Sequence, residues 1–127
     1  MYRLKFMALP LSQAQRATNP VRVLVVDDSA FMRKSLTTML EEGKQIHVVG
    51  VARNGEEAIQ QVQQLKPDVV TMDVEMPGMT GLQALQQIMS KFPVPVIMVS
   101  SITVEGAQEP LQALEWGAVD FVPKQLD

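Results

Sequence analysis

The chain has 127 residues, of which 46% are hydrophobic and 20% are charged, as in a single globular domain. Its net charge of −3 comes without any basic run, so nothing in the sequence suggests a surface for nucleic acid or for an anionic membrane. Cysteine is absent and His47 is the single histidine, which excludes disulfides, thiolate zinc sites, thiol nucleophiles and multi-histidine metal sites. The lack of cysteine is compatible with a reducing compartment, and we expect a cytoplasmic location.

The first part of the chain, residues 1–20, mixes basic, apolar and polar types without a sustained period, and Pro10 and Pro20 interrupt it. Its apolar stretch at residues 6–11 is too short for the core of a signal peptide, and no small-residue cleavage site follows. We therefore expect a loosely held N-terminal arm, followed by one domain over residues 21–127.

Four apolar segments rich in β-branched residues and one brief segment near the end of the chain predict strands, and four segments with apolar residues at helical spacing predict helices between them. The strands are expected at residues 21–26, 46–52, 69–72, 94–99 and 120–122. The helices are expected at about residues 30–42, 54–66, 80–92 and, in a short form, 110–117. This alternation with short connections predicts an α/β domain with a doubly wound, five-stranded parallel sheet.

The expected helices have recognisable ends. Ser29 and Thr80 are suited to cap the first and third helices, and Asn54 with Glu57 resembles a capping box at the start of the second. The first helix is expected to stop at Gly43. Within it, Phe31, Ser35 or Leu36, and Met39 or Leu40 recur at helical spacing.

Residues 69–78 run a buried strand into Asp73 and then break into the loop of Pro77 and Gly78. Asp73 is therefore expected at the carboxyl end of a strand, which is where open α/β sheets bind their ligands. Because parallel strands end at one edge of the sheet, further polar residues should lie close to Asp73 although they are far apart in sequence. These are Asp27, Asp28, Ser100 and Lys124.

Three carboxylates in one cleft repel one another unless a cation lies among them. Oxygen ligands without histidine or cysteine suit Mg²⁺, which also accepts phosphate oxygens. Lys124 and Ser100 could contact a phosphoryl group, and an aspartate is available as nucleophile. Each of these residues alone also has a purely structural explanation, as a cap, a loop hydroxyl or a surface charge, but their common position at one sheet edge favours a site that binds a phosphoryl group.

Four blocks of the sequence resemble the signature motifs of response-regulator receiver domains. They are Val25-Val26-Asp27-Asp28-Ser29, Met72-Asp73-Val74-Glu75-Met76-Pro77-Gly78-Met79-Thr80-Gly81, Val99-Ser100-Ser101 and Phe121-Val122-Pro123-Lys124. The resemblance covers about residues 21 to 124 and implies a flavodoxin-like three-layer sandwich.

The resemblance also implies a role for each matching residue. Asp73 would be the phosphoacceptor, and Asp28, Asp73 and the backbone carbonyl of Glu75 would bind Mg²⁺ or Mn²⁺. Asp27 would assist the metal mainly through water. Ser100 would hold a phosphoryl oxygen in the active state, Lys124 would pair with the phosphoryl group, and Phe121 would be the aromatic side chain whose rotamer follows Ser100.

Longer phrases, such as residues 28–33, 67–77, 95–101 and 117–124, resemble the receiver domains of the chemotaxis methylesterase family CheB. This resemblance implies two partners: a chemotaxis histidine kinase, and a C-terminal methylesterase domain that the receiver restrains until phosphorylation. The chain itself has no Gly-x-Ser-x-Gly motif, so we expect the regulatory part and not an enzyme.

Two positions depart from the pattern that the resemblance implies. Thr80 stands where an aspartate is usual, a mild change because threonine still caps a helix. Gln125 stands where a proline with a cis bond usually follows the lysine. A cis bond before a residue other than proline costs about 2.5–4 kcal/mol, so the orientation of Lys124 depends on how the Lys124-Gln125 bond is accommodated.

Three other functions fit parts of the same pattern. A phosphatase of the haloacid dehalogenase type needs Asp-x-Asp after the first strand, whereas Asp27 and Asp28 are adjacent. An FMN-binding flavodoxin needs a loop rich in Ser/Thr and Gly after the first strand, and the acidic pair of Asp27 and Asp28 at that place would repel the phosphate of the cofactor. A degenerate or stand-alone receiver that only binds partners would not need the complete residue set.

A sheet of this type needs a helix after its last strand, and only three residues follow Lys124. The sequence thus predicts a receiver that lacks its fifth helix and is truncated at its C-terminal end. We expect an apolar face around Leu24 and Val26 on which no helix packs, so that the chain covers this face by self-association or, less favourably, with residues 1–19.

Overall fold

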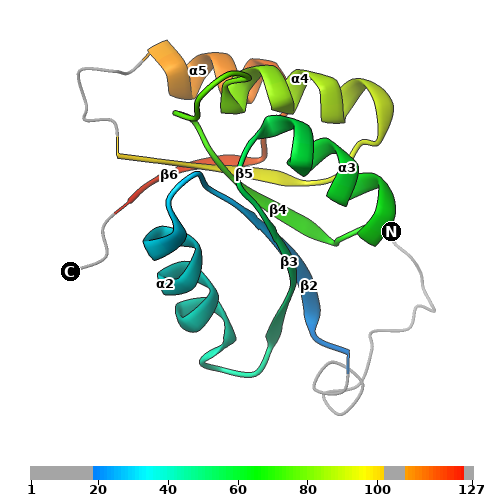
Figure 1. Ribbon diagram of the computed structural model, residues 1–127. Coiled ribbons are helices and arrows are strands. Elements are labelled where there is room, and N and C mark those ends of the chain that lie inside the picture. Colours follow the sequence, from blue (N-terminus) through cyan, green and yellow to red (C-terminus); the bar gives the residue numbers. More distant parts are fainter. Residues whose placement is uncertain (1–18, 102–107, 125–127) are drawn as a thin grey trace.

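The computed structural model describes residues 19–101 and 108–124, which fold around one five-stranded parallel sheet (Figure 1). The strands are β2 (Val21–Val26), β3 (Ile46–Ala52), β4 (Val69–Asp73), β5 (Val96–Ser100) and β6 (Asp120–Pro123). Their order across the sheet is β3-β2-β4-β5-β6. The prediction of a doubly wound parallel sheet is confirmed.

Four helices connect these strands in the described part of the chain. They are α2 (Ala30–Glu41), α3 (Gly55–Leu65), α4 (Gly81–Lys91) and α5 (Gln108–Glu115). Helix α2 lies on one face of the sheet, and α3, α4 and α5 lie on the other (Figure 1). Within the same described residues, no helix is both long enough and apolar enough to span a bilayer.

The hydrophobic core fills the space between the sheet and the three-helix layer. Alternate residues of the central strands point into it, as the period of two in a strand requires. Its fully buried members from β2, β4 and β5 are Leu24, Val26, Val70, Met72, Val96 and Met98. Helices α3 and α4 contribute apolar residues at helical spacing, including Ala58, Val62, Leu85 and Ile88. The expectation that Leu24 and Val26 face an uncovered side was therefore wrong.

Helix α2 has no fully buried residue, although its apolar residues recur at helical spacing. Phe31 is 75% exposed and Met39 is 47% exposed. The physical reason is that, in the described structure, no other helix lies beside α2 on its face of the sheet, so its lateral side chains stay in contact with solvent (Figure 1). On the same face, Val122 of β6 is 40% exposed.

The helix ends largely follow the predicted capping chemistry. The side chains of Ser29, Asn54 and Thr80 each accept a hydrogen bond from the first turn of the next helix, and Thr80 forms a complete capping box with Gln83. At α3 the expected box is incomplete, because the carboxylate of Glu57 accepts from the main chain of Arg53 and not from the cap residue.

Two further helix ends bear on the sequence predictions. Helix α2 ends at Glu41, and Lys44, not Gly43, takes the left-handed conformation after it, with φ of 61°. Helix α5 is short and begins at Gln108, within one turn of Pro110, as expected.

Candidate functional site

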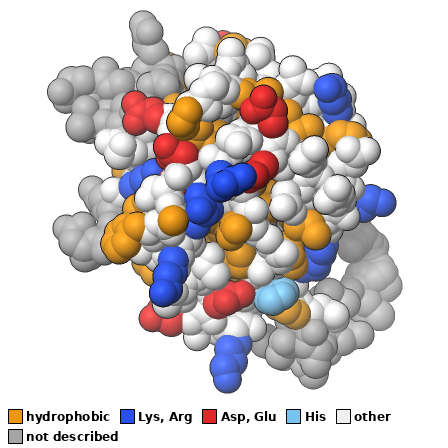
Figure 2. All heavy atoms as spheres, viewed as in Figure 1, with side chains coloured by type: hydrophobic (Ala, Val, Ile, Leu, Met, Phe, Trp, Pro, Cys, Tyr) orange, Lys and Arg blue, Asp and Glu red, His pale blue; other side chains and the backbone are white. Residues whose placement is uncertain are grey.

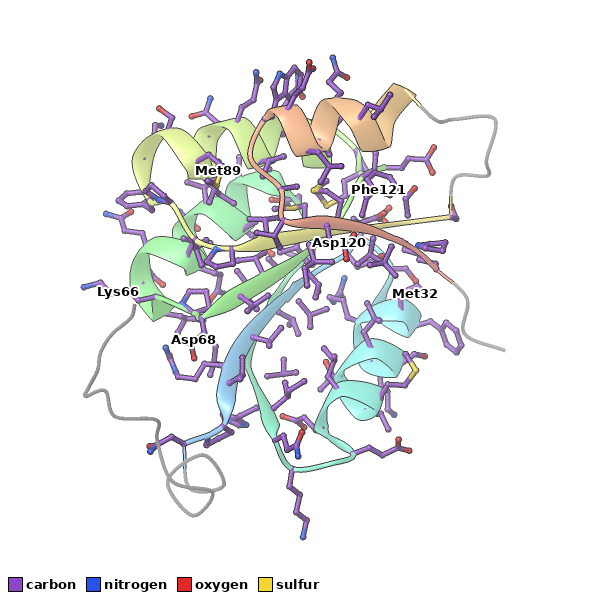
Figure 3. All side chains as sticks on the ribbon, turned by 180° about the vertical axis from the view of Figure 1, so that it is seen from behind. Met32, Lys66, Asp68, Met89, Asp120 and Phe121 are labelled. Carbon is purple, nitrogen blue, oxygen red and sulfur yellow. The ribbon has the colours of Figure 1, made fainter. Side chains whose placement is uncertain are left out.

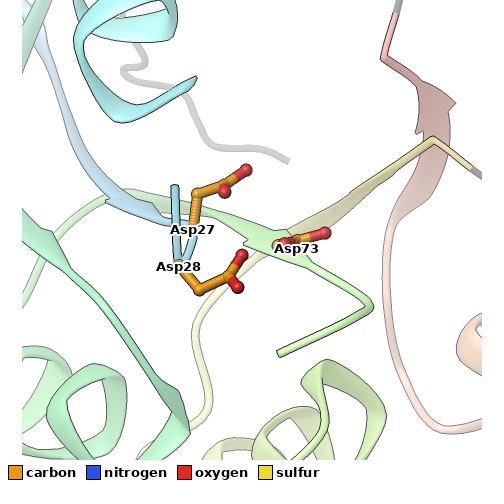
Figure 4. Close-up of side chains that lie close together, drawn as sticks. All are labelled: Asp27, Asp28 and Asp73. Atoms are coloured by element: carbon orange, nitrogen blue, oxygen red, sulfur yellow. The ribbon is translucent and has the colours of Figure 1, made fainter. Parts of the chain in front are cut away.

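Three aspartates meet at the carboxyl end of the sheet (Figure 4). Asp27 and Asp28 directly follow β2, and Asp73 is the last residue of the neighbouring strand β4. Carboxylate oxygens of all three lie within 4.8 Å of one another. Asp27 and Asp73 are almost completely buried, whereas Asp28 is exposed. The predicted convergence of these acids is what the structure shows.

Lys124 brings a positive charge to the same place from the end of β6. Its Nζ atom lies 2.8 Å from Oδ2 of Asp27 and 3.3 Å from Oδ1 of Asp73. The main-chain N–H of Lys124 donates to the carbonyl of Ser100 at 2.7 Å, which anchors this end of β6 to β5. Three carboxylates thus face one ammonium group, and the site keeps an excess of negative charge.

The charges and the burial of the site change how its groups bind protons. Burial raises the pKa of Asp73 to about 6, with a further contribution from the charge of Asp27, while Lys124 acts in the opposite direction. Burial also disfavours the charged form of Lys124, but its hydrogen bond to Asp27 and the charges of both acids outweigh this, so the pKa of Lys124 is raised. The lysine is therefore cationic over the whole range in which Asp73 titrates.

Ser100 and Phe121 lie on the two strands at the edge of this site. Ser100 is the last residue of β5, is completely buried, and is the register partner of Pro123 in β6. Phe121 is partly buried and packs against the core, on the side of the sheet that α4 and α5 cover (Figure 3). Phe121 lies two residues before Pro123, the register partner of Ser100, so Ser100 and Phe121 lie near each other on adjacent strands.

Glu75 lies in the loop that follows β4. Its main-chain N–H is 3.4 Å from Oδ1 of Asp73. Its side chain is exposed and, together with Asp28, Pro77 and Thr80, lines a hollow of about 500 Å³ beside the three aspartates. The hollow gives the site an open approach from solvent.

Two residues that sequence reasoning did not single out also touch the site. Nη1 of Arg33, on α2, donates to the main-chain carbonyl of Asp27 at 2.8 Å. The main chain of Gly81, at the start of α4, lies against Asp73, and its N–H donates to the carbonyl of Val74 at 2.9 Å. Arg33 lies four residues after the cap residue Ser29, so helical spacing could have placed it one turn into α2, near the site. The contact of Gly81 with Asp73 depends on the path of the loop between β4 and α4, which the sequence pattern does not give.

The donor set of the site fits a hard divalent cation. The carboxylate oxygens of three aspartates converge on it, two of these carboxylates are buried, and Lys124 supplies a counter-charge to those two. Such oxygen donors suit Mg²⁺ or Mn²⁺, which would relieve the remaining repulsion between the acids.

Comparison with known proteins agrees with this geometry. Residues 23–127 match the family described as the response regulator receiver domain. The chain belongs to this family. It is also 61% identical over 106 residues to a protein-glutamate methylesterase/protein-glutamine glutaminase of Oleidesulfovibrio alaskensis, and 60% identical over 104 residues to one of Pyrococcus abyssi. These matches cover 84% and 82% of this chain but 29% and 28% of the relatives, so the receiver spans less than a third of their length.

Solved structures give the same result. The receiver is similar to the response regulator domain of Thermotoga maritima CheB, with 53% identity, a TM-score of 0.80, and coverage of 84% of this chain and 79% of that one. It also resembles a chain of the CheX-CheY-BeF3-Mg²⁺ complex of Borrelia burgdorferi, with 35% identity, a TM-score of 0.77, and coverage of 85% and 81%. The fold and the resemblance to CheB receivers are thereby confirmed.

Proposed function

We propose that this receiver accepts a phosphoryl group on Asp73 from a chemotaxis histidine kinase, with Mg²⁺ bound among Asp27, Asp28 and Asp73. The observation that carries the proposal is the meeting of three carboxylates within 4.8 Å with the Nζ atom of Lys124, which contacts two of them. A purely structural cluster would not need three acids from two strands around one cation.

Asp73 is best suited to be the nucleophile. It is held at the rigid end of a central strand, and its Oδ1 contacts Lys124 at 3.3 Å. In the proposed step, an ionised oxygen of Asp73 forms a bond to phosphorus as the bond between phosphorus and the donor imidazole breaks, and the departing nitrogen keeps the electron pair and takes up a proton. Binding and orientation by charged groups account for most catalysis of such transfers.

The metal would be held by the carboxylates of Asp28 and Asp73 and the carbonyl of Glu75, with Asp27 assisting through water. When bound, Mg²⁺ neutralises charge on the oxygens of the transferring group. Lys124 would pair with one phosphoryl oxygen, and the hydroxyl of Ser100 would donate to another. The exposed Asp28 lies in the hollow beside the acids, through which the donor would approach.

The phosphorylated site would be read out on α5 and β6. Movement of Ser100 toward the phosphoryl group frees space that Phe121 can enter, and a closely packed core tends to respond by changing between two discrete arrangements. Trp116, which directly follows α5 and packs against the core, is placed to report the change.

The relatives carry methylesterase/glutaminase names, and this chain corresponds to less than a third of their length. We propose that the natural protein continues beyond residue 127 into such an esterase, that the receiver restrains it, and that phosphorylation of Asp73 relieves the restraint. In this proposal residues 1–20 form the N-terminal arm and residues 21–127 the receiver, whose last helix belongs to the continuation. Residues 1–18 lie outside the described part of the chain.

A phosphodonor assay tests the proposal. Acetyl phosphate and Mg²⁺ should add one phosphoryl group to the chain, and mass spectrometry after reductive trapping should locate it on Asp73. Asp73→Asn and chelation of the metal are the matched controls, and both should abolish labelling. Equal labelling in either control would refute the assignment. Continuous turnover of phosphate esters would instead indicate a phosphatase.

A further inference from the structure

We infer that Arg33 is a positioning residue that fixes the orientation of the metal ligand Asp28, an inference that rests on the proposed function. Arg33 does not contact the carboxylates of the site in any hydrogen bond or ion pair of the described residues. It acts on the main chain on both sides of Asp28, and this gives the exposed ligand a defined direction.

The three acids of the site are held in different ways. Oδ1 of Asp27 accepts from the N–H of Ser29 at 2.9 Å, and its Oδ2 pairs with Lys124. Asp73 is buried and also contacts Lys124. In contrast, among residues 19–101 and 108–124 no group hydrogen-bonds the carboxylate of Asp28, which is exposed. The direction of the Asp28 side chain is therefore set by its main chain.

Arg33 holds that main chain at two points. Its Nη1 atom donates to the carbonyl of Asp27, at the peptide that joins Asp27 to Asp28, over 2.8 Å. Its own main-chain N–H donates to the carbonyl of Ser29, the residue after Asp28, over 3.0 Å. The second bond belongs to the first turn of α2 and is available to any residue at this position. The first bond requires a long donor side chain.

Arg33 is only partly exposed. Its main-chain carbonyl accepts a hydrogen bond from Oγ1 of Thr37 at 2.7 Å, within helix α2. The side-chain and main-chain hydrogen bonds from Arg53 lower the pKa of Glu57, on α3, and the charge of Arg33 makes the smallest contribution in the same direction. Among the hydrogen bonds of the described residues, the guanidinium group thus contacts the main chain of Asp27 and no carboxylate of the site.

Two roles for Arg33 predict opposite effects on metal binding. If its charge merely offset the site acids, removing it would leave a more negative site and tighten Mg²⁺ binding. If Arg33 positions Asp28, removing it would weaken Mg²⁺ binding although the site becomes more negative. Loss of a group that orients a metal ligand typically reduces affinity by about 10–100-fold.

The test compares the full chain with three variants, using the shifts of the Asp28 and Ser29 amides in NMR titrations with Mg²⁺. Arg33→Met should raise the dissociation constant about tenfold, the lower end of the range for such groups. Arg33→Lys, which keeps a long donor, should recover most of the loss. The matched control is Lys34→Met, which removes the same charge from the adjacent, exposed position and should leave the affinity unchanged or slightly higher.

Unchanged or tighter binding in Arg33→Met would overturn the inference. Thermal unfolding in the absence of metal shows whether the variants are folded. If Arg33→Met does not fold, Arg33→Gln, whose amide is too short to reach the carbonyl, replaces it with the same two outcomes. A wild-type chain that does not bind Mg²⁺ would refute the proposed function, whereas wild-type binding with an unaffected Arg33→Met would refute only the role of Arg33.

Discussion

The main chain of Gly81 lies so close to Asp73 that no side chain fits between them. A β-carbon at Gly81 would overlap the carbonyl oxygen of Asp73 and would lie 2.9 Å from its carbonyl carbon. The neighbouring atoms belong to the backbone, so they cannot move aside as the end of a side chain could. The first residue of α4 thus rests directly on the residue that we propose to be phosphorylated.

We expect Gly81→Ala to displace the start of α4 or the end of β4. Overpacking of this kind costs about 1–3 kcal/mol, and the displacement should also slow phosphorylation of Asp73. Urea unfolding and the rate of labelling by acetyl phosphate measure the two effects. Gly43→Ala is the control, because a β-carbon there meets no atom within 4 Å, and it should change the stability by less than about 0.5 kcal/mol. Equal stability and labelling of the two variants would contradict the prediction.

Asp73→Asn should stabilise the protein at neutral pH in the absence of metal. The pKa of Asp73 is raised to about 6 in the folded state from 3.8, so the folded state binds more protons than the unfolded state between these values. The contribution of this carboxyl group to stability therefore falls as the pH rises from about 4 to about 6, and stays low above that. Asparagine removes this effect.

Thermal unfolding of both proteins from pH 4 to pH 8, with the metal chelated, measures this difference. The advantage of the asparagine variant should grow through the window and then level off, and added Mg²⁺ should stabilise the wild type more than the variant. An advantage that does not depend on pH would show that the charge of Asp73 is not its cause.

Replacing Lys124 with methionine should leave Asp27 and Asp73 without their shared counter-charge. Removing one partner of a buried ion pair typically costs about 3–5 kcal/mol, and Lys124 is 14% exposed, so we expect a loss near the lower end. Mg²⁺ should restore part of this stability, because the metal takes over the neutralisation. Lys91→Met removes the same charge from an exposed site on α4 and should have little effect with or without Mg²⁺. A loss that Mg²⁺ does not reduce would contradict this explanation.

Ser100→Ala should separate phosphorylation from its readout. Asp73 and Lys124 are intact in this variant, so labelling should continue, although a donor to the phosphoryl group is lost. The accompanying change in Trp116 fluorescence and in amide exchange over residues 112–124 should disappear. The same signals must change in the phosphorylated wild type. If they do not change there, the coupling runs through another part of the protein.

The exposed side of α2 should make this chain associate with itself. Phe31 is 75% exposed beside a partly covered sheet face, and such apolar surface favours association. Sedimentation should therefore show association that rises with concentration and that Phe31→Lys weakens. Leu111→Lys, on α5 across the sheet, introduces the same charge at another exposed apolar residue and should leave association unchanged. A chain that is monomeric at all concentrations would contradict the prediction.

The sequence predicted the strands and the convergence of the site well because both follow from local rules. Asp73, Ser100 and Lys124 each end an apolar β segment, and parallel pairing brings such ends together whatever the details of packing. Burial of α2 could not be predicted in the same way. The spacing of Phe31 and Met39 defines a face of the helix, but whether that face is covered depends on neighbours that are distant in sequence or absent from the described structure.

Other features depend on exact contacts. The roles of Gly81 and Arg33 follow from a loop path and a side-chain direction that no periodicity encodes. The assignment of Leu24 and Val26 to a sheet face required knowing which helices cross to which side. The geometry of the Lys124-Gln125 bond bears on the orientation of the Lys124 side chain, but Gln125 lies outside the described part of the chain.

Charged side chains of both signs are interspersed on the face in Figure 2, which agrees with the lack of a basic run in the sequence.

The position of Lys124 at the end of the last strand has a consequence for synthesis of the protein. The three aspartates leave the ribosome first, and Lys124 follows Asp73 by roughly 50 residues, a delay of several seconds at about 5–20 residues per second. Until β6 pairs with β5, the nascent chain has the acids without their lysine. Pairing of β6 with β5 therefore adds the edge strand to the sheet and also brings Lys124 into contact with Asp27 and Asp73.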